Sequence, residues 1–241
     1  MQNSYFCSNS YLNVYELASK NSNISTQLLY GEKFKIIEKK NKWLKIKTSY
    51  DNYTGFIRNR KFLKNMKVTH KVSSLKANLY SKPEKNYLVS HKLPFCSLIS
   101  VKKKGKKFYR IGKYWIEKKD IVPIDYKMKL FKDIKYFKNI PYRWGGKSYK
   151  GIDCSALVQL FFKFNNQYCP RDTKDQINYF KKAKKIKKNA IIFWKGHVAV
   201  CLSNKNLIHA YGPRKKVLIM NILKTLILIE KTAKLKVIGI R

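Results

Sequence analysis

The first half of the chain contains an internal repeat of short apolar segments, and this repeat restricts the folds open to it. Three pairs of segments correspond in order: 12–19 with 77–84, 30–46 with 94–111, and 55–63 with 114–122. In both copies apolar and polar residues alternate between Lys-Asn or Lys-Gly turns, the pattern of short, half-buried strands. Each copy has room for about five such strands, which predicts two small β-barrels. One irregular β-sandwich is the alternative.

Three local signatures stand out: a Leu-Tyr start (79–80), a Gly-Glu after the second strand (31–32), and Gly-Phe (55–56) or Tyr-Trp (114–115) before the last strand. They resemble bacterial SH3-like domains over residues 12–65 and 75–124. We therefore expect a first SH3-like domain at 1–66 and a second at 67–125. The expected core of the first copy is Phe34, Ile36, Trp43, Leu44, Ile46, Phe56 and Ile57.

The pattern changes at about residue 126. Residues 125–140 have helical spacing, and Pro141 would end that helix. A Gly-rich aromatic loop then leads into a predicted buried helix with an apolar stripe at Ala156, Leu157, Leu160, Phe161 and Phe164. Strands are predicted at 190–194, 197–202, 207–210, 216–222 and 236–240. Helices followed by an antiparallel sheet predict an α+β domain over 126–241.

Cys154 stands at the start of the predicted buried helix, directly after Asp153, which can cap it. A helix N-terminus lowers the pKa of a thiol, and the thiolate is the nucleophilic form. A buried structural thiol is the alternative. The other cysteines are scattered and form no CxxC pair, so we expect no disulfide framework, zinc site, other metal or cofactor.

A base for this thiol can come from His197 or His209, the two histidines of the second half. In a hairpin with a three-residue turn at 203–205, Ala199 lies opposite His209, and His197 lies diagonally on the same face. A four-residue turn would point the two rings in opposite directions. We predict the three-residue turn.

Four segments in order, PYRWGGKSYKGIDCSALV, RDTKDQ, FWKGHVAV and LIHA, resemble the NlpC family of papain-like cysteine peptidases over 126–241. The resemblance implies a papain-like α+β fold. It also implies that Cys154 attacks an amide carbonyl, that His197 pairs with it as an imidazolium and protonates the leaving amine, and that His209 orients His197. Tyr142 and the amide of Cys154 would face the oxyanion.

The RDTKDQ segment resembles the branch of the family that carries N-terminal SH3-like domains and trims free murein peptides. By this resemblance, Asp153 and Ser155 would hold the γ-D-glutamyl part of the substrate. Arg171 would lie beside the pocket, and Asp172 would bind the free L-Ala ammonium. The implied reaction is hydrolysis of the γ-D-glutamyl–diamino acid bond in a murein tri- or tetrapeptide, as a step of cell-wall peptide recycling.

Two residues of the first SH3-like domain, Glu32 and Tyr53, are our candidates to complete the amine pocket. A pocket lined by carboxylates would select a free amine over the amide of an intact glycan strand. The chain also departs from the family pattern, because Ala156 and Ala199 stand where glycine is common and NAI (189–191) replaces a frequent Gly-Asp. These changes are expected to narrow the pocket without removing a catalytic group.

The formal net charge is +41, from 54 Lys and Arg against 13 Asp and Glu. It can reflect anionic partners or the codon bias of an A/T-rich genome, since lysines are spread along the whole chain. A non-enzymatic cationic protein that binds cell wall or nucleic acid is the alternative function. The complete set of catalytic residue types favours the enzyme, so no nucleic-acid partner is expected.

Two absences in the sequence bear on location. There is no apolar run of about 18 residues, so no membrane span is expected. The start has no basic patch followed by an apolar core, which predicts a cytoplasmic protein or one trimmed of its leader.

Overall fold

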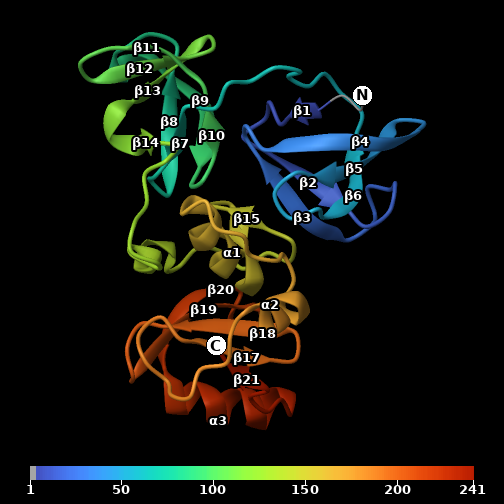
Figure 1. Cartoon of the computed structure of the whole chain (residues 1–241), viewed down its shortest axis with the longest axis vertical. Helices are drawn as coiled ribbons and strands as arrows, with labels where there is room; N and C mark the ends of the chain where they lie inside the picture. Colours follow the sequence, from blue (N-terminus) through green and yellow to red (C-terminus); the bar gives the residue numbers. More distant parts are fainter. Residues whose placement is uncertain (1–3) are drawn as a thin grey trace. The chain divides into compact units, whose positions relative to one another are not determined.

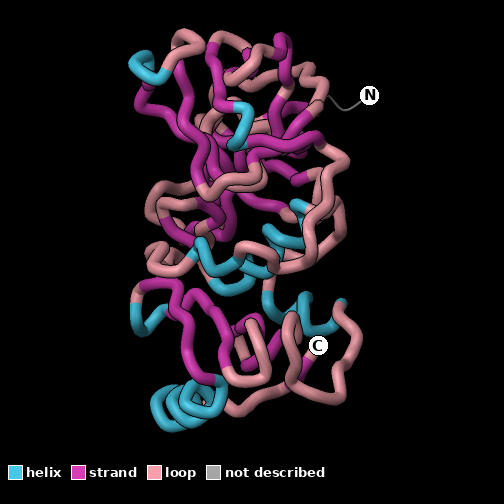
Figure 2. The backbone as a smooth tube through the Cα atoms, turned by 90° about the vertical axis from the view of Figure 1, so that its left-hand side faces the viewer, coloured by secondary structure: helices cyan, strands magenta, loops and turns pink. Residues whose placement is uncertain are grey.

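The computed structural model describes residues 4–241, and the chain divides into two units (Figure 1). Unit 1 comprises Met1–Lys127 with Lys147–Tyr149, and unit 2 comprises Met128–Gly146 with Lys150–Arg241. Strands are the main element of the fold, and helices are confined to short stretches (Figure 2). The domain limits 1–66, 67–125 and 126–241 stay predictions.

The first part of unit 1 is a six-stranded antiparallel sheet in the order β1-β4-β5-β6-β2-β3. Its strands are β1 (Ser4–Phe6), β2 (Tyr11–Tyr15), β3 (Ile24–Leu29), β4 (Lys33–Lys40), β5 (Trp43–Thr48) and β6 (Thr54–Arg58). Five of the seven predicted core residues are buried, namely Phe34, Trp43, Leu44, Ile46 and Ile57. The other two, Ile36 and Phe56, are half-buried.

The second part of unit 1 consists of two sheets, in the orders β11-β12-β13-β8-β9 and β10-β7-β14. The first sheet contains β8 (Lys76–Tyr80), β9 (Leu88–Pro94), β11 (Val101–Lys104), β12 (Phe108–Ile111) and β13 (Tyr114–Glu117). The second contains β7 (His70–Val72), β10 (Leu98–Ile99) and β14 (Ile121–Pro123). Short 3-10 helices lie at η1 (Lys85–Tyr87) and η2 (Lys118–Asp120).

The two halves of unit 1 share one strand order. The order β11-β12-β13-β8-β9 in the second half repeats β4-β5-β6-β2-β3 in the first. Tyr15 pairs with Phe56 in the first half, and Tyr80 pairs with Trp115 at the corresponding place in the second. The sequence repeat therefore corresponds to a repeat of strand order.

Unit 2 is built on an antiparallel sheet in the order β20-β19-β18-β17-β21. These strands are β17 (Ile191–Trp194), β18 (His197–Cys201), β19 (Asn206–Tyr211), β20 (Lys216–Asn221) and β21 (Gly239–Ile240). The helices are α1 (Cys154–Phe164), α2 (Thr173–Tyr179) and α3 (Ile222–Ala233), with 3-10 turns η3 (Ile134–Phe137) and η4 (Gly212–Arg214). The short strands β15 (Lys147–Ser148) and β16 (Gly151–Ile152) precede α1. Since α1 contacts β18 and β19, its predicted apolar stripe is buried.

The helix predicted over 125–140 is wrong. Phe131 and Asp133 adopt left-handed backbone angles, with φ of 58° and 64°, which an α-helix does not allow, and only η3 forms. The apolar residues are nevertheless buried, because Phe131 and Phe137 place their rings 5.8 Å and 5.5 Å from Phe161. The helical spacing therefore predicted which positions are buried, but it predicted the wrong secondary structure for them.

Helix α3 was not predicted. Strand β20 ends at Asn221, whose side-chain oxygen accepts a hydrogen bond from Lys224 N at 3.1 Å and so caps the helix. Ile222 and Ile229 of α3 join a core cluster that includes Trp194 and Leu207 of the sheet.

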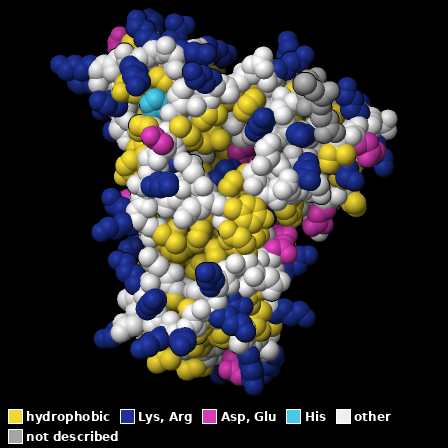
Figure 3. All heavy atoms as spheres, viewed as in Figure 1, with side chains coloured by type: hydrophobic (Ala, Val, Ile, Leu, Met, Phe, Trp, Pro, Cys, Tyr) yellow, Lys and Arg dark blue, Asp and Glu magenta, His cyan; other side chains and the backbone are white. Residues whose placement is uncertain are grey.

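Lysine and arginine side chains are spread over the face drawn in Figure 3, with few acidic side chains among them. Within residues 4–241, no helix has the length and apolar character needed to cross a bilayer.

Candidate active site

The start of α1 is fixed by Asp153, its N-cap residue. One carboxylate oxygen, Oδ1, accepts the backbone N–H of Ala156 at 2.8 Å, and Oδ2 accepts that of Gly145 at 2.9 Å. The first bond caps the helix as the sequence predicted. The second ties the Gly-rich loop to the same carboxylate.

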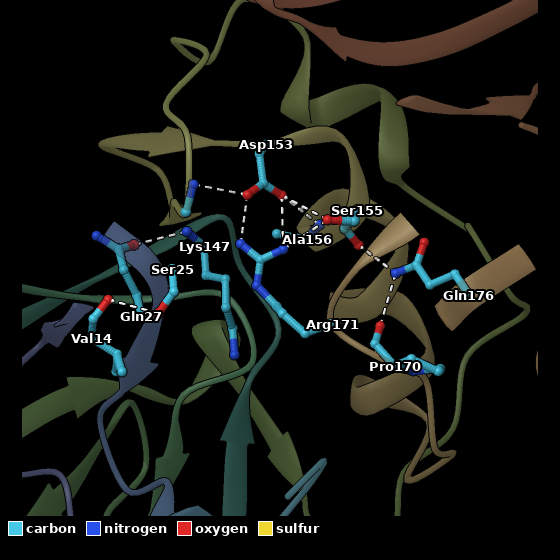
Figure 4. A network of polar contacts seen from close by, with 11 residues as sticks. Val14, Ser25, Gln27, Lys147, Asp153, Ser155, Ala156, Pro170, Arg171 and Gln176 are labelled. Atoms are coloured by element: carbon cyan, nitrogen blue, oxygen red, sulfur yellow. Dashed lines mark hydrogen bonds and ion pairs between the residues drawn. The ribbon is translucent and has the colours of Figure 1, made fainter. Parts of the chain in front are cut away.

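Arg171 holds this carboxylate from the other side (Figure 4). Its Nη1 donates to Asp153 Oδ1 at 3.1 Å and to Ser155 Oγ at 2.7 Å, and its Nη2 donates to Asp153 Oδ2 at 2.5 Å. Arg171 is 3% exposed and Asp153 6%, so the two-pronged pair is shielded from water. A buried carboxylate is stable in its charged form only when a cation is paired with it. Because Arg171 bonds both Asp153 and Ser155, it holds the residues on either side of Cys154.

Gln176 of α2 links that helix to the same region. Its Nε2 donates to the carbonyl oxygens of Ser155 and Pro170, each at 2.9 Å (Figure 4). Sequence analysis included this residue in the RDTKDQ segment but gave it no role. Nothing in the sequence except its amide side chain, which can donate hydrogen bonds, indicated this role.

Cys154 is 7% exposed, and the backbone N–H groups of Val198 and Ser155 point to its sulfur. Burial, together with the nearby Asp153 carboxylate, raises the pKa of the thiol to about 12. The sequence argument expected the helix N-terminus to lower this pKa. In the structure, loss of solvation outweighs the helix end and its N–H groups, which favours the protonated thiol.

The two histidines meet as the predicted hairpin requires. Val200 pairs with Ile208 and Cys201 with Leu207, and Leu202 N donates to Asn206 O at 2.8 Å around the turn. Continued along the strands, this register places Ala199 opposite His209 and His197 on the same face. The predicted three-residue turn is confirmed, and His197 Nε2 lies 2.9 Å from His209 Nδ1.

Aromatic side chains surround this histidine pair. Tyr211 stacks on His209 with ring centroids 4.8 Å apart and an interplanar angle of 9°, and Trp194 lies 5.5 Å from His197. Burial lowers the pKa of His197 to about 4 and that of His209 to about 3. Burial thus favours the neutral form of both rings, and the imidazolium role of His197 stays a prediction. Sequence analysis missed Tyr211, although its two-residue spacing from His209 puts it on the same face.

A hydrogen bond joins the rings of His197 and His209. The thiol of Cys154 is bonded to the backbone N–H of Val198, the residue after His197. Transfer of the Cys154 proton to His197 therefore belongs to the proposed function below.

Tyr142 is half-buried in unit 2, and its backbone N–H donates to Lys215 O at 2.8 Å. Burial and the nearby Cys154 raise the pKa of its phenol well above the ordinary value. The phenol thus keeps its proton and can donate a hydrogen bond to a developing oxyanion.

The remaining candidates lie in both units. Asp172 is the N-cap residue of α2 and is half-buried. Glu32 and Tyr53 belong to unit 1, where Glu32 pairs with Lys147 Nζ at 3.4 Å and Tyr53 N donates to Thr48 Oγ1 at 2.9 Å. Their part in binding an amine stays a prediction.

The buried histidines predict how stability depends on pH. In the unfolded chain a histidine binds its proton near pH 6.5, whereas the folded pKa values are about 4 and 3. Between pH 6.5 and these values the unfolded state binds more protons, so the free energy of unfolding falls as the pH falls. For the fully buried His209 alone, the free energy of unfolding should fall by roughly 3 kcal/mol by about pH 4.

Thermal unfolding followed between about pH 7.5 and 4.5 checks this prediction. The double variant His197→Gln/His209→Gln should lose most of the pH dependence of unit 2. His70, in unit 1, remains in that variant and shows how much a histidine outside the pair contributes. An equally steep dependence in the variant would contradict the assignment to the pair.

Comparison with known proteins gives matches over both units. Residues 139–232 match the NlpC/P60 family, and residues 10–64 match the bacterial SH3 domain. The chain is 27% identical over 173 residues to a gamma-D-glutamyl-L-lysine dipeptidyl-peptidase of Bacillus subtilis, covering 64% of this chain and 57% of that relative. It is 24% identical over 231 residues to dipeptidyl-peptidase 6 of Lysinibacillus sphaericus, covering 82% and 84%.

A solved structure has the same fold over nearly the whole chain. The crystal structure of an NlpC/P60 family protein from Bacillus cereus superposes with a TM-score of 0.85 at 20% identity. The match covers 99% of this chain and 98% of that one.

Proposed function

We propose that this chain, which carries an NlpC/P60 domain at 139–232 and a bacterial SH3 domain at 10–64, is a cysteine peptidase. It hydrolyses the γ-D-glutamyl–diamino acid bond of peptidoglycan-derived peptides that have a free N-terminal L-Ala. The observation that carries the proposal is the hydrogen-bonded histidine pair in the same unit as a capped, buried Cys154. The name of the Bacillus subtilis relative, a gamma-D-glutamyl-L-lysine dipeptidyl-peptidase, supports the choice of bond.

Acylation starts from a neutral thiol. As Sγ of Cys154 attacks the substrate carbonyl, its proton passes to His197 Nδ1, the ring nitrogen opposite the one bonded to His209. The N–H of Cys154 and the Tyr142 hydroxyl donate to the oxyanion. His197 then protonates the leaving amine of the diamino acid as the C–N bond breaks, which leaves a thioester on Cys154.

Water completes the cycle. His197 removes a proton from the water that attacks the thioester, and that proton returns to the sulfur when the acyl group leaves. The released product is L-Ala-γ-D-Glu. Asp153, Ser155 and Arg171 would shape the γ-D-glutamyl subsite, and Asp172 would bind the ammonium.

The proposal extends to the fold of two parts of the chain. We propose a papain-like arrangement for 126–241 and a second SH3-like barrel at 67–125. The repeated strand order of unit 1 supports the second barrel. We also propose a cytoplasmic location, in keeping with a role in peptide recycling and with five free thiols.

The substrate experiment compares a free amine with a blocked one. The protein is incubated with L-Ala-γ-D-Glu-L-Lys, its diaminopimelate analogue and the N-acetylated form of each, and dipeptide release is followed by mass spectrometry. The free peptides should be cleaved at least about 100-fold faster, because acetylation removes the charged ammonium that the proposed pocket would bind. Equal cleavage of both forms would refute the amine pocket. No release from any peptide would leave a cationic binding protein as the better account of the +41 charge.

A further inference from the structure

His209 lies between a nitrogen and a sulfur. Its Nδ1 is 2.9 Å from His197 Nε2, and its Nε2 is 3.4 Å from Sδ of Met220. His209 is 0% exposed, so its ring must find its hydrogen-bond partners within the protein.

The sheet register explains why the sulfur is there. His209 pairs with Leu218 and Leu207 pairs with Met220, so Met220 lies diagonally from His209 on the same face. His197 lies diagonally from His209 on the other neighbouring strand. Three strands, β18, β19 and β20, thus present His197, His209 and Met220 in a row.

The chemistry of the sulfur assigns the protons along this row. A thioether has no proton to give and can only accept, so Nε2 of His209 must carry a proton. A neutral imidazole carries only one, and the buried ring favours the neutral form. Nδ1 of His209 is then an acceptor, and the hydrogen between the rings must sit on Nε2 of His197.

The tautomer of His209 determines that of His197, the proposed base. A neutral His197 with its proton on Nε2 has a free electron pair on Nδ1, the nitrogen that must take the Cys154 proton. The opposite set of tautomers would put a proton on Nδ1, and His197 could then accept nothing there. The wrong tautomer of a catalytic histidine is costly, even where the geometry is intact.

We propose that Met220 is a positioning residue that sets the tautomers of His209 and His197 through its sulfur. The assignment of tautomers depends on geometry alone. Its consequence for catalysis rests on the proposed function.

The test reads the tautomers directly. The protein is labelled with 15N-histidine, and ring nitrogen shifts are recorded at about pH 7.5, where both rings are neutral. Wild type should show Nε2-protonated rings at both positions. Met220→Leu, which keeps the volume but removes the acceptor, should shift His209 toward the Nδ1-protonated form and lower kcat at least about tenfold with little change in KM.

Two further variants separate the sulfur from general packing. Met220→Gln supplies an amide oxygen as acceptor and should restore the wild-type tautomers and most of kcat. Met128→Leu makes the same chemical change at a methionine whose backbone bonds to Asn165, and should change neither readout.

The outcomes are distinguishable. An Nδ1-protonated His209 in wild type, or unchanged tautomers in Met220→Leu, would overturn the proposal whatever the activity. The expected spectra together with no peptide hydrolysis by wild type would support the tautomer assignment and refute the peptidase. The wild-type spectrum can overturn the tautomer assignment by itself, so the proposal stays testable even if a variant does not fold.

Discussion

Replacing Cys154 by alanine is expected to lower release of L-Ala-γ-D-Glu by a factor of about 10⁴ or more. The variant lacks the sulfur that forms the thioester. A water molecule bound in its place could not form a covalent intermediate with the substrate. The N–H donors of Val198 and Ser155 remain, so peptide binding should persist while turnover stops. Single-turnover assays by mass spectrometry, with isothermal titration for binding, measure the two effects separately.

Cys201→Ala is the matched control. Cys201 is also a buried thiol of unit 2, and burial raises its pKa to about 11, but it lies within the sheet core. This variant should keep near-normal turnover with a modest loss of stability. Substantial turnover by Cys154→Ala would remove the nucleophile from the mechanism.

Arg171→Met is expected to lower the free energy of unfolding of unit 2 by about 3 kcal/mol or more. The change leaves the buried Asp153 carboxylate without its cation, while the remaining N–H donors of Gly145 and Ala156 compensate only in part. Hydrogen exchange of the α1 amides measures the local effect, which should be largest in the first turn.

A double-mutant cycle distinguishes lost charge pairing from lost packing. Asp153→Asn keeps a capping oxygen but removes the charge, so Asp153→Asn/Arg171→Met should be less destabilised than the sum of the two single variants. Arg60→Met, at an exposed arginine bonded to Asn9, should change stability little. Additive single and double variants would show that the pair does not stabilise the start of α1.

The features that the sequence predicted well are those determined by local periodicity. The alternation in 197–202 and 207–210 predicted the two strands, and the three-residue turn chosen between them has the register that joins His197 to His209. The apolar stripe after Asp153 likewise predicted both α1 and its cap.

The features that the sequence could not predict depend on tertiary contacts. Phe131 and Phe137 have helical spacing, but they reach the core through left-handed turns that no apolar pattern encodes. The Arg171–Asp153 pair joins residues 18 apart across α1 and the loop after it, and Met220 reaches His209 only because β20 pairs with β19. The acidity of the thiol was misjudged because desolvation depends on the complete core and not on the helix end alone.

An uncharged sulfur between turnovers has a chemical benefit. Peroxides and alkylating agents attack thiolates, so a buried sulfur that favours the protonated form reacts slowly with them. Such a protein would tolerate oxidant stress that inactivates hydrolases whose cysteines are exposed and ionised.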